Sequence, residues 1–149
     1  MTLDEVKLMW KEDSVIDLDD LFTEAKRGGI LHSRYLDIHA DASRAVKKLK
    51  LKYDREASFK NNYYAGRYNV KEYEELLKSR NLEPIRVKYL KPDIQRLLDG
   101  DPDLIAILEQ KIESEEIEDF TSDILKNIHN RGFAITNAID WKKFETGNF

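Results

Sequence analysis

Apolar residues recur every three or four positions along most of the chain, which is the spacing of one face of an α-helix. The longest run predicts a helix of more than thirty residues. Its apolar positions are Leu31, Tyr35, Ile38, Ala42, Ala45 or Val46, Leu49, Tyr53, Ala57 and Tyr64, with Leu21 and Ala25 upstream. Gly28 and Gly29 interrupt the run, and they mark either a break between two helices or a close approach by a neighbour.

A second long run begins at Pro102, because Asp101 suits an N-cap and proline suits the first helical position. Its apolar positions are Ile105, Leu108, Ile112, Ile117, Phe120, Ile124 and Ile128. The five-residue step from Ile112 to Ile117 rotates the apolar face, so its two halves are expected to contact different neighbours. Gly132 is expected to cap or kink this helix.

Shorter elements surround the two long helices. Thr2 and Glu5 have the spacing of a capping box, which predicts a helix ending near Asp13. Asp17 is expected to cap the following helix. Weaker helical patterns lie at 70–81 and 92–98, and apolar and basic residues alternate at 85–89 as in a strand. The fold class is therefore all-α, with long helices packed as a helical hairpin or bundle and a short extended segment around 82–91.

Composition narrows the class of protein. The chain of 149 residues is one domain's length and has no cysteine, which excludes disulfides, thiolate metal sites and cysteine nucleophiles. No stretch approaches the roughly 18 apolar residues of a membrane span, and the first residues do not form a secretion signal. An intracellular protein without membrane contact is expected.

Charge is unevenly distributed, although the net charge is only −4. Residues 1–24 carry eight acids and two lysines, and residues 99–123 carry ten acids and one lysine. Residues 44–67 reverse this balance, with eight basic residues and two acids. A local basic surface can bind phosphate whatever the total charge, because salt screens distant charges.

Four cations of the middle third share one face of the predicted helix, at i, i+4, i+8 and i+11, and cations alternate with aromatic rings just downstream. This combination is typical of sequence-tolerant binding to single-stranded DNA, where rings stack on bases. The candidate DNA-binding residues are Arg44, Lys48, Lys52, Arg55, Lys60, Tyr63, Tyr64 and Arg67. The alternative is a solvated helix face with tyrosines in the core, in a helical scaffold or protein–protein adaptor without DNA contact.

Catalytic chemistry has little support. Carboxylates between Glu113 and Asp123 would predict metal-dependent nuclease activity if they bound a metal, but acids at such density are typical of a solvated face. The three histidines are dispersed and no phosphate-binding glycine loop occurs. We expect no enzyme activity, cofactor or metal site.

The C-terminal segment has more large apolar side chains than a single internal face of a polar monomer could bury. Self-association is therefore expected through Phe133, Ile135, Ile139, Trp141 and Phe144.

Five short motifs occur in order along essentially the whole chain. They are Met9-Trp10-x-x-Asp13-Ser14-x-Ile16-Asp17, Leu31-His32-x-Arg34-Tyr35, Tyr63-Tyr64-x-Gly66-Arg67, Asn130-Arg131-Gly132-Phe133-Ala134-Ile135 and Trp141-x-x-Phe144-x-x-Gly147. Together these motifs resemble one known family, the UvsY recombination mediators of T-even-like phages, with features of its marine myophage branch.

The resemblance implies a recombination mediator that binds single-stranded DNA and helps load a RecA-like recombinase onto DNA covered by single-strand-binding protein. It implies contacts with the phage recombinase and single-strand-binding protein, a hexamer or heptamer, and the cytoplasm of the infected host cell. Residues 1–149 would form one mediator domain, with about 1–98 binding DNA and about 101–149 assembling the oligomer. Lys60 matches a functional basic position of the family, whereas the position two residues earlier is Ser58.

Overall fold

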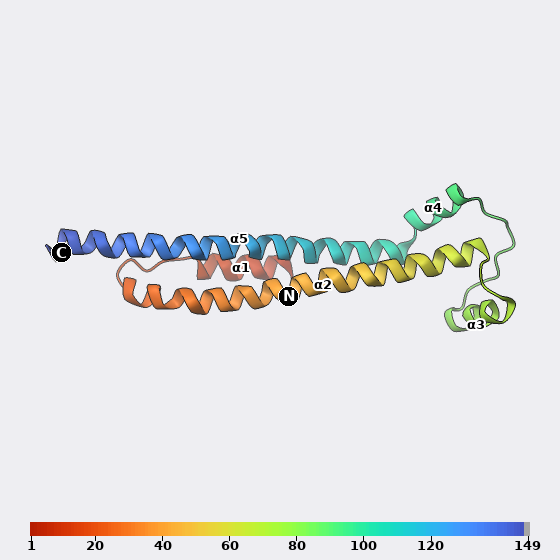
Figure 1. Ribbon diagram of the computed structural model, residues 1–149, viewed down its shortest axis with the longest axis horizontal. Helices are drawn as coiled ribbons and strands as arrows, with labels where there is room; N and C mark the ends of the chain where they lie inside the picture. The colour runs from red at the N-terminus through yellow and green to blue at the C-terminus, as the bar shows by residue number, and fades with distance from the viewer. Residues whose placement is uncertain (148–149) are drawn as a thin grey trace. The chain divides into compact units, whose positions relative to one another are not determined.

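The computed structural model describes residues 1–147, which contain five helices and no strand (Figure 1). The helices are α1 (Leu3–Asp13), α2 (Leu21–Ala65), α3 (Val70–Arg80), α4 (Lys91–Asp99) and α5 (Pro102–Glu145). The all-α prediction is confirmed. Contacts divide the chain into two compact units: a first unit of Met1–Val46 with the chain from Ile112 onward, and a second unit of Lys47–Lys111.

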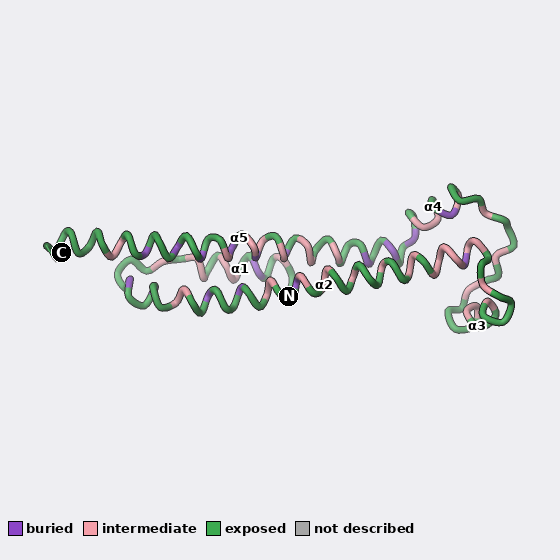
Figure 2. Tube along the Cα trace, viewed as in Figure 1, coloured by how far each residue is buried: buried purple, intermediate pink, exposed green. Residues whose placement is uncertain are grey.

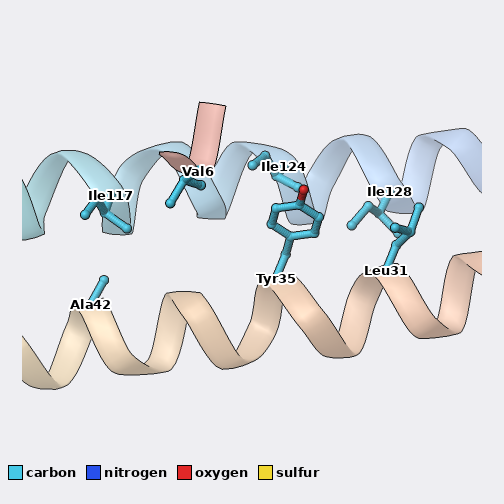
Figure 3. Packing of buried hydrophobic residues seen from close by; sticks show 7 residues of the cluster. All are labelled: Val6, Leu31, Tyr35, Ala42, Ile117, Ile124 and Ile128. Atoms are coloured by element: carbon cyan, nitrogen blue, oxygen red, sulfur yellow. The ribbon is translucent and has the colours of Figure 1, made fainter. Parts of the chain in front are cut away.

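In the first unit, α1 packs against α2 and α5, which run antiparallel (Figure 1). Buried positions follow a three–four repeat on both long helices, as in an antiparallel coiled coil. The core cluster contains Val6 of α1, Leu31, Tyr35 and Ala42 of α2, and Ile117, Ile124 and Ile128 of α5 (Figure 3). Figure 2 shows the resulting periodicity, with buried turns facing the partner helix and exposed turns facing solvent. The predicted core faces are confirmed in this unit by the residues of this cluster, but Ala25 and Ile112 are exposed, so these two predicted core positions are wrong.

Helix α1 is fixed at both ends. The expected capping box is present, because Thr2 Oγ1 accepts from Glu5 N and Glu5 Oε2 accepts from Thr2 N. At the other end, Asp13 Oδ2 lies 2.8 Å from both Arg34 Nη1 and Tyr35 Oη. Burial alone would raise the pKa of Asp13, but these hydrogen bonds and the charge of Arg27 outweigh it and lower the pKa.

A buried ion pair replaces apolar contacts near the start of α2. The Arg131 guanidinium of α5 pairs with the Glu24 carboxylate, and both side chains are more than nine-tenths buried. Arg27 also lies 3.3 Å from Glu24. Within residues 1–147, Arg131 Nε and Nη1 find no hydrogen-bond partner. The pair therefore places charge inside the helix interface, where charge is costly unless it is paired.

Two sequence predictions about α2 are wrong, and Gly132 does not cap α5. Helix α2 runs through Gly28 and Gly29 without a break, and a Cβ at either position would meet nothing within 4 Å, so no described neighbour approaches closely. Asp20, not Asp17, caps α2, since its Oδ1 accepts from Thr23 N. Helix α5 does not end at Gly132, because packing on the first unit continues past it to the buried Ile135.

The second unit contains the C-terminal part of α2, the short helices α3 and α4, the segment 81–90 and the start of α5. Asn81 ends α3 in the left-handed conformation, φ 54°, as expected for asparagine after a helix. Segment 81–90 forms no strand; it is an irregular connection held by two tyrosines. Tyr63 Oη donates to Glu83 O, and Ile85 N donates to Tyr73 Oη at 2.6 Å. Tyrosine side chains thus supply hydrogen bonds to backbone groups of this segment. In a strand, the same groups would bond to a neighbouring strand.

The start of α5 presents a different face from the one expected. Leu104 and Ile107 are buried, whereas Ile105 and Leu108 are 40% and 37% exposed. Asp101 caps this end of the helix by accepting from Leu104 N, and it also binds a lysine of α2. Leu104, three positions after Asp101, therefore lies close to this contact with α2.

Candidate nucleic-acid interface

Exposed cations lie on α2 in both units: Arg44 in the first unit, and Lys48, Lys52 and Arg55 in the second, where these three share one face that we call the basic face. All four side chains are exposed. None forms an ion pair with any residue in the described part of the chain. The steps of four residues from Lys48 to Lys52 and three residues from Lys52 to Arg55 place these positions about 6 Å and about 4.5 Å apart along the helix axis. These groups are available to bind phosphates.

Lys60 does not belong to the basic face, and it is not the free cation that the sequence predicts. Its ammonium lies 2.6 Å from both carboxylate oxygens of Asp101 and 2.9 Å from Asp103 Oδ2, with Glu56 at 4.0 Å. Burial would lower the pKa of Lys60, but the hydrogen bonds to Asp101 and Asp103 reverse this and raise it. The ammonium is therefore neutralised by acids at the start of α5 and is not directed at solvent.

The tyrosine pair at the end of α2 has two different environments. Tyr63 is buried, its hydroxyl is bonded to Glu83 O, and its pKa is raised by burial. Its ring packs against Tyr73 with centroids 6.2 Å apart. Tyr64 is half-buried and meets the Tyr89 ring edge-on at 5.8 Å. Tyr63 thus organises the unit, contrary to its expected role as an exposed stacking ring, whereas Tyr64 remains partly accessible.

Arg67 follows the end of α2 and is exposed. Gly66 adopts φ 64°, which glycine tolerates and other residues rarely do, and Arg67 N donates to Asn62 O at 3.1 Å. This turn places Arg67 at the edge of a cavity instead of continuing the basic face.

The cavity has a volume of about 740 Å³ and lies wholly within the second unit, between the end of α2, α3 and the segment leading into α4. Its lining includes the rings of Tyr64, Tyr73 and Tyr89. It also includes four exposed cations, Arg67, Arg86, Lys88 and Lys91, and one exposed acid, Glu74. Sequence reasoning found only Tyr64 and Arg67 here. The signal for the others is the density of cations between residues 86 and 91, but the same residues also fit the alternation of a strand.

The C-terminal apolar residues divide between core and surface. Ile135 is only 3% exposed and packs inside the first unit, so its expected outward position is wrong; the three–four repeat that buries Ile124 and Ile128 also buries it. Ile139 is half-buried. Phe133, Trp141 and Phe144 are 61%, 62% and 59% exposed, and the last two rings stack at 5.6 Å. Three large aromatic side chains therefore remain at the surface of one helix.

Among residues 1–147, none of the helices combines the length and the apolar character that a membrane span requires. No cluster of three or more histidine, aspartate or glutamate side chains in the same residues could hold a metal ion.

An all-α chain with unpaired cations along its longest helix, and a tyrosine-lined cavity with a basic edge, has the features of a helical nucleic-acid-binding protein. The chain belongs to the UvsY family, described as recombination, repair and ssDNA binding protein, which it matches over residues 9–148. The resemblance inferred from the sequence motifs is confirmed, and so is the expectation of a recombination protein of the single-stranded-DNA-binding class.

Relatives and solved structures agree with this assignment. Recombination protein uvsY of Enterobacteria phage T4 is 25% identical over 147 residues, covering 99% of each chain. One crystal structure of the bacteriophage T4 recombination mediator protein UvsY, lattice type II, has a TM-score of 0.79 at 25% identity and covers 98% of both chains. Another, lattice type IV, has a TM-score of 0.78 at 23% identity, covering 97% of this chain and 99% of the other.

Proposed function

We propose that this protein binds single-stranded DNA through the basic face of α2 and helps load a RecA-like recombinase onto DNA covered by single-strand-binding protein. The observation that carries the proposal is the basic face itself: its exposed cations have no carboxylate partner among residues 1–147. Such cations release counterions from the DNA backbone when they bind phosphates, which gives salt-dependent affinity. Membership of the UvsY family supports the same function.

We further propose that the protein acts as a homo-oligomer of six or seven copies, assembled through the exposed aromatic residues Phe133, Trp141 and Phe144, with Ile139 at their margin. Burial of these rings against another copy would remove apolar surface from water. Repetition of the basic face in each copy would raise the effective concentration of sites along one strand, and avidity gains of about 10²–10⁴ follow from such linkage.

Mediation follows from the way a strand would be held. A DNA strand that is bound by several copies of the protein follows a path set by the protein, and its bases are partly unstacked. Such a strand is released more readily by its coating protein and is accepted by the recombinase. The proposed partners are therefore single-stranded DNA, the phage recombinase and the phage single-strand-binding protein, in the cytoplasm of the infected cell.

The test is the salt dependence of binding to fluorescent oligo-dT, measured by anisotropy. Each lost phosphate contact reduces the slope of log K against log[salt] by about 0.7. Lys52→Ala with Arg55→Ala should therefore weaken binding at low salt and make the slope shallower by about 1.4 for each engaged copy. The matched control is Lys11→Ala with Lys126→Ala, which removes the same charge from exposed positions of the first unit.

If the control variant loses as much affinity as the test variant, the effect comes from net charge alone. If the salt slope of the test variant does not change, the basic face is refuted as the DNA site. Failure of the wild type to bind at low salt would leave a helical scaffold without DNA contact. Loading is tested separately, by the lag before a recombinase hydrolyses ATP on DNA coated with single-strand-binding protein; the wild type should shorten the lag and the test variant should not.

A further inference from the structure

The cavity of the second unit has chemistry that the basic face lacks. At about 740 Å³ it lies within the ~300–1,000 Å³ typical of sites that hold a small organic ligand. Its walls offer the rings of Tyr64, Tyr73 and Tyr89, together with the apolar side chains of Leu77 and Ile85. Aromatic walls of this kind bind flat rings by stacking, an interaction that a phosphate group cannot make.

The cavity is also built in advance of any ligand. The bond from Ile85 N to Tyr73 Oη, at 2.6 Å, ties the segment before α4 to α3. The bond from Tyr63 Oη to Glu83 O ties the same segment to α2. Tyr64 and Tyr89 then meet edge to face across one side of the cavity, with ring centroids 5.8 Å apart. A cavity held by side-chain bonds from two helices loses little conformational entropy when it is filled.

Charge at the cavity favours an anionic ligand. Arg67, Arg86, Lys88 and Lys91 are exposed along it, and Glu74 is the one acid in its lining. These four cations have no ion pair within the portion of the chain that the structure describes. A ligand that combines a flat ring with a flanking phosphate matches this arrangement, and a nucleotide has both groups.

We propose that this cavity receives an unpaired base of the bound DNA strand, with the flanking phosphates on Arg67, Arg86, Lys88 and Lys91. The inference rests on the proposed function and adds a reason why the protein would prefer single strands to duplex DNA. The basic face binds phosphates, which duplex and single strands share. The cavity needs a base that is free of its partner and stack, and in a duplex extrusion of a base costs unpairing and unstacking. The second unit therefore distinguishes single strands from duplex DNA.

Tyr89 provides the sharpest test, because its ring meets Tyr64 edge to face at the cavity while its hydroxyl holds no backbone group within residues 1–147. Tyr89→Leu keeps an apolar side chain but removes the ring, and Tyr89→Phe keeps the ring. Tyr53→Leu is the matched control, since Tyr53 is a half-buried tyrosine of α2 in the same unit that does not line the cavity. Binding of the full-length variants to a dT hexamer and to a short duplex is measured across a salt series.

Tyr89→Leu should weaken binding to the dT hexamer by about 5- to 150-fold, the loss of one stacked base. Its salt slope and its affinity for the duplex should not change, so the ratio of single-strand to duplex affinity falls by the same factor. Tyr89→Phe and Tyr53→Leu should match the wild type. Unchanged hexamer binding in Tyr89→Leu, or an equal loss for hexamer and duplex, would overturn the proposal.

A second measurement uses the unaltered protein and so does not depend on how a variant folds. Irradiation of oligo-dT that carries 5-iodouracil links the base to an adjacent aromatic ring, and the linked peptide is then identified by mass spectrometry. Crosslinks to Tyr64, Tyr73 or Tyr89 support the cavity, and crosslinks confined to other residues overturn it. If Tyr89→Leu binds normally while Lys52→Ala with Arg55→Ala loses salt dependence, the cavity proposal fails and the proposed function stands.

Discussion

Replacement of Lys60 separates two roles that the sequence could not distinguish, a phosphate contact and a structural ion pair. Lys60→Met keeps most of the aliphatic length but removes the ammonium from a site with Asp101 oxygens at 2.6 Å and Asp103 at 2.9 Å. Asp101 is buried and would be left as an uncompensated charge beside Glu56. We expect a large loss of stability and no change in the salt slope of DNA binding.

The magnitude follows from burial. Removal of one partner of a fully buried pair costs about 3–5 kcal/mol. The side chains of Lys60 and Asp101 are 13% and 9% exposed, so the lower end applies, and the exposed Asp103 adds little. A loss of about 3 kcal/mol lowers the melting temperature of a chain of this length by about 6–12 °C. Thermal unfolding followed by circular dichroism, at matched protein concentration, measures this shift.

Asp101→Asn completes a double-mutant cycle with Lys60→Met. Asparagine can still cap α5 by accepting from Leu104 N, but it leaves no charge to be neutralised. The double variant Lys60→Met with Asp101→Asn should therefore recover most of the stability lost in Lys60→Met alone. The reasoning is refuted if Lys60→Met melts like the wild type and makes the salt slope of oligo-dT binding shallower, because Lys60 would then contact phosphate.

The remaining predictions concern other parts of the chain. Gly28→Ala with Gly29→Ala should raise the free energy of unfolding in urea by about 0.5–1 kcal/mol per site, since both lie inside α2 with open space around them; a loss would indicate a neighbour from another copy. Phe133→Glu with Trp141→Glu should lower the molar mass seen by light scattering without loss of helix content, whereas Lys126→Glu should not; an unchanged mass would remove these rings from the oligomer interface. The pKa of Asp13 is lowered from its ordinary 3.8, so its contribution to stability is complete above that pH and is lost as the pH falls through the folded value; wild type should lose more stability than Asp13→Asn between pH 5 and 3, and equal losses would contradict this.

Local sequence signals predicted the helices well where one residue type determines the backbone. The capping box at Thr2, the aspartate and proline at the start of α5, and Asn81 at the end of α3 all act within one turn, so their effects were visible without tertiary structure. The three–four repeat likewise predicted the core of the first unit.

Other features depend on partners distant in sequence. Ile105 and Leu108 match a helical repeat as well as Leu104 and Ile107 do, so the repeat alone does not tell which pair is buried. Lys60 is likewise indistinguishable in the sequence from the free cations of the basic face. The cavity could not be predicted because Tyr73 and Tyr89 meet Tyr63 and Tyr64 only after the chain has turned back twice.

The ion pair between Glu24 and Arg131 limits how the first unit can assemble. Antiparallel helices with a seven-residue repeat can slide past one another by one repeat and still match apolar side chains with apolar side chains. After such a slip Glu24 would face Ile124 or Ala138 in place of Arg131, and both charges would be stranded in an apolar interface. That penalty amounts to several kcal/mol, so only one alignment of the hairpin is favourable. A charge pair that adds little net stability thereby excludes the misaligned hairpins that the apolar repeat alone would allow.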